Sequence, residues 1–191
     1  MGLSSRWLLM RTLYRVDDVF DEIAIPTLKT DRLILRGWRA DDVDALHAIY
    51  ADRNVARWLG WPDPDHVDAS IQRWLAHWQR WGFGVWAVEV AGVFIGRIGL
   101  VHHDDWTASA HDAEVGWTLA TSAWGQGYAT DGARAALDFA REKGLRDVIS
   151  ITRPDNVRSQ AVMRRLGLTY GGATHWHGYD QVWYGTAIGP A

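Results

Sequence analysis

Two glycines one residue apart, Gly125 and Gly127, directly precede a run of good helix formers in "SAWGQGYATDGARAAL", residues 122–137. Glycine allows a positive φ and lets the backbone approach a ligand closely. The first N–H groups of a helix have no intrahelical partner, and together with the helix dipole they attract anions. The turn is therefore predicted to hold a phosphate-bearing ligand, most favourably a diphosphate. Taken alone, Gly-x-Gly is more typical of an ordinary loop-to-helix turn than of a ligand site.

The segments around this turn favour the ligand-binding interpretation. "AEVGWTL", residues 113–119, predicts a strand before it, and "DVISIT", residues 147–152, predicts a buried strand after the helix. The three segments form a β-α-β unit. "NVRSQAVMRRLGL" then predicts a second helix that carries Asn156 and Ser159 in its first turn.

The order "AEVGWTLATSAWGQGYATDGARAALDFA" followed by "NVRSQAVMRRLGL" resembles the GCN5-related N-acetyltransferase (GNAT) superfamily. The opening "LKTDRLILRGWRADDVDAL" is similar to the ribosomal-protein alanine and serine N-acetyltransferase (RimJ/RimL-like) branch. The resemblance covers roughly residues 26–185. It implies an acetyl-CoA-dependent N-acetyltransferase, in which a primary amine of a protein N-terminus or a small molecule attacks the thioester directly in a ternary complex.

The resemblance also implies which residues bind acetyl-CoA. Backbone amides of the glycine turn would hold the pyrophosphate, the open edge of the preceding strand would pair with the pantetheine amides, and the second helix would approach the thioester. Trp124 stands where the family has Gln or Arg. The implied cofactor-binding residues are Trp117, Thr118, Leu119, Gly125, Gln126, Gly127, Tyr128, Ala129, Thr130, Asn156 and Ser159. Arginines 153, 158, 164 and 165 offer either partners for the 3′-phosphate or a solvated basic face.

Two proton transfers are needed, one from the acceptor amine and one to the leaving thiolate. Glu114, at the head of its strand, is the candidate base through a water molecule, and the alternative is a solvated strand-end glutamate. Many family members use a tyrosine as the general acid at the position where this chain has Met163. Ser159 is the candidate acid in its place, through a hydrogen bond to the sulfur. The alternative is that its hydroxyl bonds to helix backbone. Tyr170 and Tyr179 stay open as acids.

The acceptor is expected to meet the first two helices, the loop "WLGWPDPD" between them, and the last strand pair. Four aromatic side chains are expected on the acceptor side: Trp58, Trp61, Trp74 and Trp78. Of these, Trp58, Trp61 and Trp78 are the candidate substrate-binding residues, with a place in the core as the alternative. Acidic residues at 63, 65, 104 and 105 could attract a cationic amine or be plain surface acids. The sequence does not choose an acceptor.

The composition bounds the class of protein. The chain has 191 residues, 48% of them hydrophobic, and a formal net charge of −3, which suits one compact domain and shows no basic excess for nucleic acid. The lack of cysteine excludes disulfides and thiolate chemistry. No apolar run approaches the roughly 18 residues that span a membrane. We therefore expect a cytoplasmic protein with no membrane or nucleic-acid partner, and a homodimer is left open.

Three groups of histidines raise the question of a metal site: His102–His103, His111 and His175-x-His177. No carboxylate spacing completes a recognisable set of ligands. We expect no metal.

The predicted fold class is α+β, with a mixed sheet of the GNAT type. It has about seven strands in a twisted, mostly antiparallel sheet, a splayed parallel pair and about four helices. Residues 26–191 would form this domain. Residues 1–25 would form a helical extension, because Leu9, Leu13, Val16, Phe20 and Ile23 make one apolar stripe; a true start at Met10 is the alternative.

Three other functions remain open. A dinucleotide-binding oxidoreductase would use the same turn, with Asp147 as its ribose-binding acid, but Thr130 occupies the third glycine position of that motif. A non-catalytic acyl-CoA sensor would keep the turn without turnover. A transferase of another acyl group, such as succinyl, would differ only near the thioester.

Overall fold

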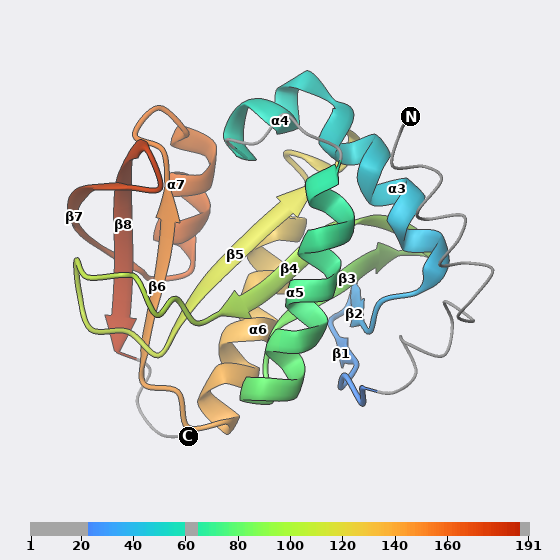
Figure 1. Ribbon diagram of the computed structural model, residues 1–191, viewed down its shortest axis with the longest axis horizontal. Coiled ribbons are helices and arrows are strands. Elements are labelled where there is room, and N and C mark those ends of the chain that lie inside the picture. The colour runs from blue at the N-terminus through green and yellow to red at the C-terminus, as the bar shows by residue number, and fades with distance from the viewer. Residues whose placement is uncertain (1–22, 60–64, 188–191) are drawn as a thin grey trace.

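The computed structural model describes residues 23–59 and 65–187, and its centre is one twisted sheet (Figure 1). The sheet has eight strands in the order β1-β2-β3-β4-β5-β6-β8-β7 within the described residues. The strands are β1 (Leu28–Lys29), β2 (Ile34–Arg36), β3 (Val85–Val90), β4 (Val93–Val101), β5 (Ala113–Leu119), β6 (Asp147–Thr152), β7 (Thr169–Trp176) and β8 (Tyr179–Ala187). The helices are α3 (Ala40–Ala51), α4 (Arg53–Leu59), α5 (Asp65–Trp81), α6 (Tyr128–Glu142) and α7 (Val157–Arg165), with a 3-10 turn η1 (Thr121–Ala123).

The predicted fold is confirmed: the sheet is mixed, and β5–β6 is its parallel pair. The described part holds one strand and one helix more than predicted. The extra strand is β1. The extra helix arises because "RADDVDALHAIYADRNV", residues 39–55, whose apolar spacing predicts one helix, breaks at Asp52. Asp52 has extended backbone, with φ −66° and ψ 119°. Its carboxylate accepts the Asn54 N–H at 2.8 Å, so it starts α4 as a cap.

Asp41 and Asp42 precede the apolar positions of this segment, which predicts one of them as the N-cap; in the structure Asp42 has a different role. The helix begins after Arg39, and the Asp42 carboxylate reaches back to accept the Arg39 N–H at 2.7 Å. The first turn is therefore held by a side chain within the helix.

Helices cover both faces of the sheet: α3 and α5 lie on one face and α6 on the other (Figure 1). Alternate side chains of β3 serve the two sides. Trp86 and Val88 pack in a cluster with the small residues of α6, whereas Val85 and Ala87 pack with α3 and α5. This two-sided core fixes the strand between the two helical layers.

The parallel pair β5–β6 is joined at two positions only, Ala113 with Val148 and Glu114 with Ile149. Beyond these pairs the strands diverge (Figure 1). The edge of β5 that faces β6 is therefore open from residue 115 to residue 119. This divergence creates the site described below.

The predicted helical extension lies almost wholly outside the described residues, so the division at residue 25 stays a prediction. Among the residues that the structure describes, no helix is long and apolar enough to cross a bilayer.

A buried ion network joins the first strands to α3. The Arg36 guanidinium donates to both carboxylate oxygens of Asp42, at 2.7 and 2.9 Å, and to Glu89 at 2.7 Å. Each of the three side chains is less than a tenth exposed. Because Arg36 has two acidic partners, its loss would leave two buried carboxylates without it.

We expect Arg36→Met to lower the free energy of unfolding by about 3–5 kcal/mol, the cost of breaking a buried pair. Arg39→Met is the matched control, because Arg39 touches the same Glu89 at 3.4 Å with a side chain that is 63% exposed. Its loss should cost about 0–1 kcal/mol. Urea denaturation of both variants measures the difference, and equal losses would show that burial does not strengthen the network.

Candidate active site

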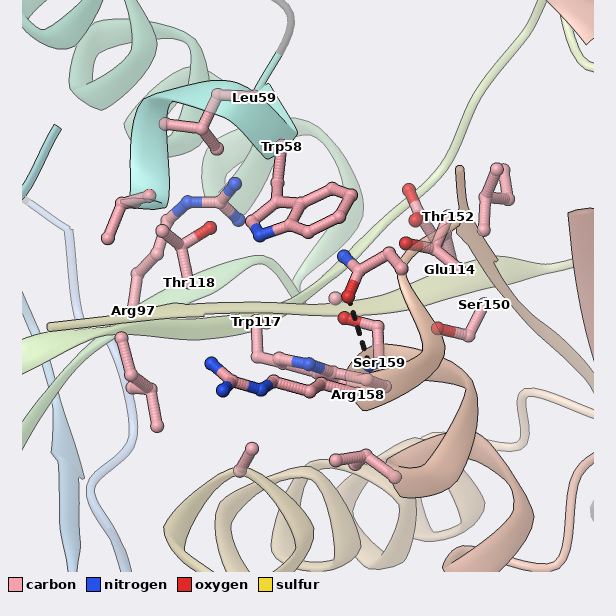
Figure 2. Close-up of a pocket in the computed structure, with 18 of the residues that line it drawn as sticks. Trp58, Leu59, Arg97, Glu114, Trp117, Thr118, Ser150, Thr152, Arg158 and Ser159 are labelled. Atoms are coloured by element: carbon pink, nitrogen blue, oxygen red, sulfur yellow. Dashed lines mark hydrogen bonds between the residues drawn. The ribbon is translucent and has the colours of Figure 1, made fainter. Parts of the chain in front are cut away.

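The divergence of β5 and β6 opens a cleft of about 1640 Å³. Its walls come from both strands, from α4 and α5, and from the first turns of α6 and α7 (Figure 2). Most of the residues predicted for the cofactor, the acceptor and the chemistry meet here, although they come from segments far apart in the sequence.

The glycine turn forms one end of the cleft. Gly125 and Gly127 have φ values of 76° and 84°, in the left-handed region that favours glycine. None of the six N–H groups from residue 125 to residue 130 donates to another residue in the described part of the chain. The turn at the start of α6 is thus a cradle of unpaired amides, as the sequence predicted, and suits an anion.

Arg32 holds this cradle from outside. Its Nη1 donates to the Gln126 carbonyl at 2.8 Å, and its Nε donates to the Asp131 carboxylate at 2.8 Å. A Cβ on Gly127 would lie 3.0 Å from the Arg32 Nη2. The arginine from the β1–β2 turn therefore fixes both the loop and the first turn of α6.

Trp124 braces the same loop. Its indole N–H donates to the Leu119 carbonyl at 2.8 Å, and the Arg158 guanidinium lies 5.1 Å from its ring centroid. The departure from the family pattern at this position thus has a structural role. It also occupies the Leu119 carbonyl. The Thr118 carbonyl points to β4, next to Gly96, so Trp117 is the predicted edge residue whose backbone faces the opening.

The two faces of β5 serve different sides of the cleft. In Figure 2, Thr118 lies above the strand, on the side of Trp58 and Leu59 from α4, whereas Trp117 lies below it beside Arg158. Glu114 shares the face of Thr118, because side chains alternate along a strand.

The start of α7 supplies a polar corner. The Asn156 side chain, 8% exposed, accepts the Ser159 N–H at 3.2 Å and caps the helix. The Ser159 hydroxyl lines the cleft and bonds to no other residue in the described segments, so the alternative in which it bonds helix backbone is not seen. Met163 is 1% exposed in the core, and Tyr170 is exposed away from the cleft, whereas Tyr179 lines it.

Glu114 is oriented by a histidine. Its Oε2 lies 2.6 Å from the His103 Nε2, and both side chains are 19% exposed. Its Oε1 lies over Gly116, 3.8 Å from where a Cβ would stand. Glu114 is therefore neither solvated nor free: one oxygen is held by His103, and the other faces the opening between the strands.

The charge of His103 follows from its surroundings. Burial lowers its pKa, but the hydrogen bond and charge of Glu114, with the charge of Asp105, outweigh burial, and the pKa of His103 is raised. Sequence reasoning noted His103 only as part of a histidine pair. The signal that could have found its role is its place just after β4, opposite the start of β5.

The other histidines here bond to protein groups. His77 Nδ1 donates to the Phe83 carbonyl at 2.7 Å, and its Nε2 accepts the His102 N–H at 2.9 Å. Burial lowers the pKa values of His77 and of His111. No group of three potential metal ligands occurs among the described residues.

The four arginines predicted around α7 divide in two. Arg158 and Arg165 line the cleft. Arg153 instead donates to the Arg57 carbonyl at 3.3 Å, and Arg164 donates to the Tyr184 hydroxyl at 3.1 Å. Two arginines thus remain for a phosphate near the cradle.

The predicted acceptor residues separate as well. Trp58 lines the cleft from α4 (Figure 2), and Trp61 lies outside the described residues. The prediction for Trp78 is wrong: it is 4% exposed in the core, packs edge-on against Trp86 and donates to the Val85 carbonyl at 3.1 Å. One turn earlier on α5, Trp74, which was also expected on the acceptor side, lines the cleft.

The predicted acidic side chains are already paired where the structure describes them. Asp104 lies 3.6 Å from Arg80 and 3.3 Å from His102. Asp105 accepts from His177 at 2.6 Å and from Trp176 at 3.2 Å. Asp63 and the side chain of residue 65 lie outside the described part.

Sequence reasoning missed several residues that line the cleft. Ser150 and Thr152 on β6 alternate with apolar neighbours, and this period of two was the available signal. Arg97 on β4 also lines the cleft, and no pattern in the sequence indicated its contacts.

Comparisons with known proteins agree on one family. The acetyltransferase (GNAT) domain family model matches residues 32–169. The "FsC-acetyl coenzyme A-N(2)-transacetylase" of Aspergillus fumigatus is 32% identical over 156 residues, 77% of this chain, and the chain spans 66% of that relative's length. The uncharacterised N-acetyltransferase YnaD of Bacillus subtilis is 32% identical over 74% of this chain and 81% of its own.

Solved structures show the same fold. An acetyltransferase from Agrobacterium tumefaciens has a TM-score of 0.74 at 31% identity and covers 85% of this chain and 94% of its own. A RimL ribosomal L7/L12 alpha-N-protein acetyltransferase in complex with coenzyme A has a TM-score of 0.70 at 23% identity, over 85% of this chain and 98% of its own. At that identity the likeness to RimL is one of fold.

The raised pKa of His103 leads to a prediction about stability. Its pKa lies above the ordinary value of 6.5, so the stabilising contribution of the protonated ring is fully present below that pH and is lost as the pH rises through the raised value. His103→Gln should therefore lower the free energy of unfolding by about 1.5–3 kcal/mol near pH 6, and by less near pH 9. Urea denaturation at the two pH values measures the change.

The groups facing His103 that titrate or carry charge are Glu114, Asp105, His77 and His111. His175→Gln is the control, because the exposed His175–Asp180 pair should contribute little at either pH. A loss in His103→Gln that is the same at both pH values would contradict the charged pair.

Proposed function

Because the chain belongs to the GNAT acetyltransferase family, we propose that it is an acetyl-CoA-dependent N-acetyltransferase that acts on a primary amine by direct attack in a ternary complex. One observation carries the proposal: the amide cradle, the open edge of β5 and the oriented Glu114 carboxylate all face one cleft. The family and its relatives support an acyltransferase, and the acceptor is part of the proposal.

The cleft fits the donor from one end to the other. The unpaired amides of residues 125–130 suit the pyrophosphate, and Arg158 and Arg165 offer charge for the 3′-phosphate. Trp117 presents strand backbone to the pantetheine amides, which would add to the sheet as a further strand does, while the Thr118 side chain faces the cleft. The thioester would then lie between Glu114 and Ser159.

The chemistry proposed for these side chains is acid–base. Glu114 Oε1, directly or through water, accepts the proton of the acceptor ammonium. The freed amine forms a bond to the thioester carbon, and collapse of the tetrahedral species breaks the C–S bond. The sulfur leaves as a thiolate that takes up a proton, and the Ser159 hydroxyl hydrogen-bonds to it. Such proton transfers contribute about 10²–10⁴-fold, and placing the amine beside the thioester supplies much of the remainder.

His103 is a positioning residue in this scheme. It binds Glu114 Oε2 and thereby leaves Oε1 toward the opening. The loss of a tyrosine acid at Met163 favours one rival function, a sensor that binds acyl-CoA without turnover.

The proposal predicts products that mass spectrometry can identify. The chain, incubated with acetyl-CoA or succinyl-CoA and a library of primary amines and peptides, should yield N-acetylated products. Glu114→Gln should lower kcat about 10²–10³-fold, while the melting-temperature rise caused by acetyl-CoA is kept. Tight acetyl-CoA binding without any product would favour the sensor. Succinylated products alone would favour the other acyl donor, and stabilisation by NADH only would favour the oxidoreductase.

The cradle itself can be tested with two matched glycines at opposite ends of α6. Gly125 and Gly144 have φ values of 76° and 77°, and a Cβ would meet no atom within 4 Å at either position. Alanine at either site should cost about 1–2 kcal/mol of folding free energy. Gly125→Ala alone should raise the KM for acetyl-CoA about tenfold or more, because cradle hydrogen bonds to a charged group contribute about 1.5–3 kcal/mol.

Steady-state kinetics and urea denaturation on both variants separate these effects. An equal change in KM for Gly125→Ala and Gly144→Ala would assign the effect to lost stability and would refute the cradle.

A further inference from the structure

Arg97, a further arginine that lines the cleft, lies on the opposite side of β5 from Arg158. Arg97 on β4 is paired in register with Thr118. In Figure 2, Arg97 and Thr118 lie above β5 with Trp58 and Leu59, whereas Trp117 and Arg158 lie below the strand. Arg97 is therefore on the face that carries Glu114, away from the side of α6 and the cradle.

The Arg97 guanidinium is held in place by aromatic residues. Its Nε donates to the Tyr50 hydroxyl at 2.7 Å, and its Cζ lies 4.9 Å from the Trp74 ring centroid. Trp74 in turn stacks on Trp38, with centroids 5.2 Å apart, and the buried Trp38 donates to the Val85 carbonyl at 2.9 Å. The planar fork is thus pre-organised, which lowers the entropy lost when it binds a ligand.

No protein anion pairs with Arg97 in the described part of the chain. The described acidic residues that line the cleft are Glu114 and Asp131, and these are bound to His103 and Arg32. The Arg97 Nη groups make no hydrogen bond to another described residue, although the side chain is half-buried. A half-buried charge without a counter-charge is unfavourable, so the arrangement suits an anion from a ligand.

Packing alone does not explain this arginine. An arginine that merely covers a tryptophan keeps its head group in bulk water. The Arg97 head group instead lies within the cleft, on the side of β5 that carries Trp58 (Figure 2). Arg73 also lines the cleft, with its Nη2 donating to the Ser70 hydroxyl at 2.8 Å.

Resting on the proposed N-acetyltransferase function, we propose that Arg97 binds a carboxylate of the acceptor. The guanidinium fork matches the two oxygens of a carboxylate, and Trp58, Trp74 and Tyr50 provide apolar walls for the carbon chain between carboxylate and amine. The acceptor is thus a primary amine that also carries a carboxylate.

The strand register sets the distance between these two groups. Thr118 lies opposite Arg97, and Glu114 lies opposite Val101. The four-residue step corresponds to roughly 13 Å of strand, less the reach of the two side chains. The amine and the carboxylate must therefore be several bonds apart, as in an ω-amino acid or a short acidic peptide, and not on the same carbon.

Matched acceptors that differ only in the carboxylate test the proposal. The small-molecule pair is 6-aminohexanoate and 6-aminohexanamide, and the peptide pair is C-terminally amidated Ala-Ala-Glu and Ala-Ala-Gln. In the wild type, kcat/KM with acetyl-CoA should be about tenfold to a hundredfold higher for the carboxylate member of at least one pair, since a charge-assisted contact is at stake. The pair that shows the preference tells whether the carboxylate comes from a small molecule or from a peptide.

The Arg97 variants then assign the preference. Arg97→Gln should bring the carboxylate-to-amide ratio close to one, with the KM for acetyl-CoA unchanged. Arg97→Lys, which keeps the charge but loses the fork, should keep an intermediate ratio. Arg141→Gln is the matched charge control, because the Arg141–Asp138 pair lies on α6 away from the cleft. Melting temperatures check that each variant is folded.

Binding provides a readout that does not need turnover. Calorimetry with the CoA-saturated wild type should give a lower Kd for 6-aminohexanoate or for the glutamate peptide than for its amide partner. Arg97→Gln should remove this difference in Kd. A wild type that binds acetyl-CoA and shows this difference but forms no product would refute the proposed transferase and keep the carboxylate site. A preference that survives in Arg97→Gln, or no preference in either turnover or binding, would overturn the carboxylate site.

Discussion

The site depends on the short pairing between the parallel strands β5 and β6. β5 and β6 are hydrogen-bonded at two residue pairs only, and beyond Glu114 the facing edge of β5 has no strand beside it. Backbone N–H and C=O groups need partners, and groups that open into a cleft can find them in water or in a ligand. An incomplete sheet thus becomes a binding surface, because the backbone that would have joined two strands is available to a molecule that resembles a strand.

Polar groups without a partner among the described residues also occur at the starts of α6 and α7, where each helix borders the cleft. The first turn of α6 leaves its amides unpaired, and two side chains hold the loop in that conformation: Arg32 from outside the cleft and Trp124 from the loop itself. At α7 the Asn156 side chain caps the helix, which leaves the Ser159 hydroxyl free toward the cleft. Support from neighbouring side chains is what keeps these polar groups aimed at a ligand.

The parts of the site that the sequence predicted depend on local chemistry. A positive φ needs glycine at 125 and 127, and a helix start needs a cap such as Asn156. The parts it missed depend on strand register and on packing between elements. His103, just after β4, bonds to Glu114 on the neighbouring strand β5, and Arg97 on β4 bonds to Tyr50 on helix α3. Trp74 and Trp78 show the limit most clearly. Four residues turn a helix by only about 40° beyond one full turn, so periodicity cannot tell which ring fills the core and which lines the cleft.

Donor and acceptor are therefore recognised by different means. The proposed donor site consists mainly of backbone amides and a strand edge, which tolerate many side chains and carry a recognisable pattern of glycines and caps. The proposed acceptor site consists of side chains on α4, α5 and β4, where a single arginine changes the charge of the surface. The names of the fungal FsC transacetylase and of RimL give different acceptors for two proteins that resemble this chain. For this chain, the half-buried guanidinium of Arg97 is the feature that narrows the choice.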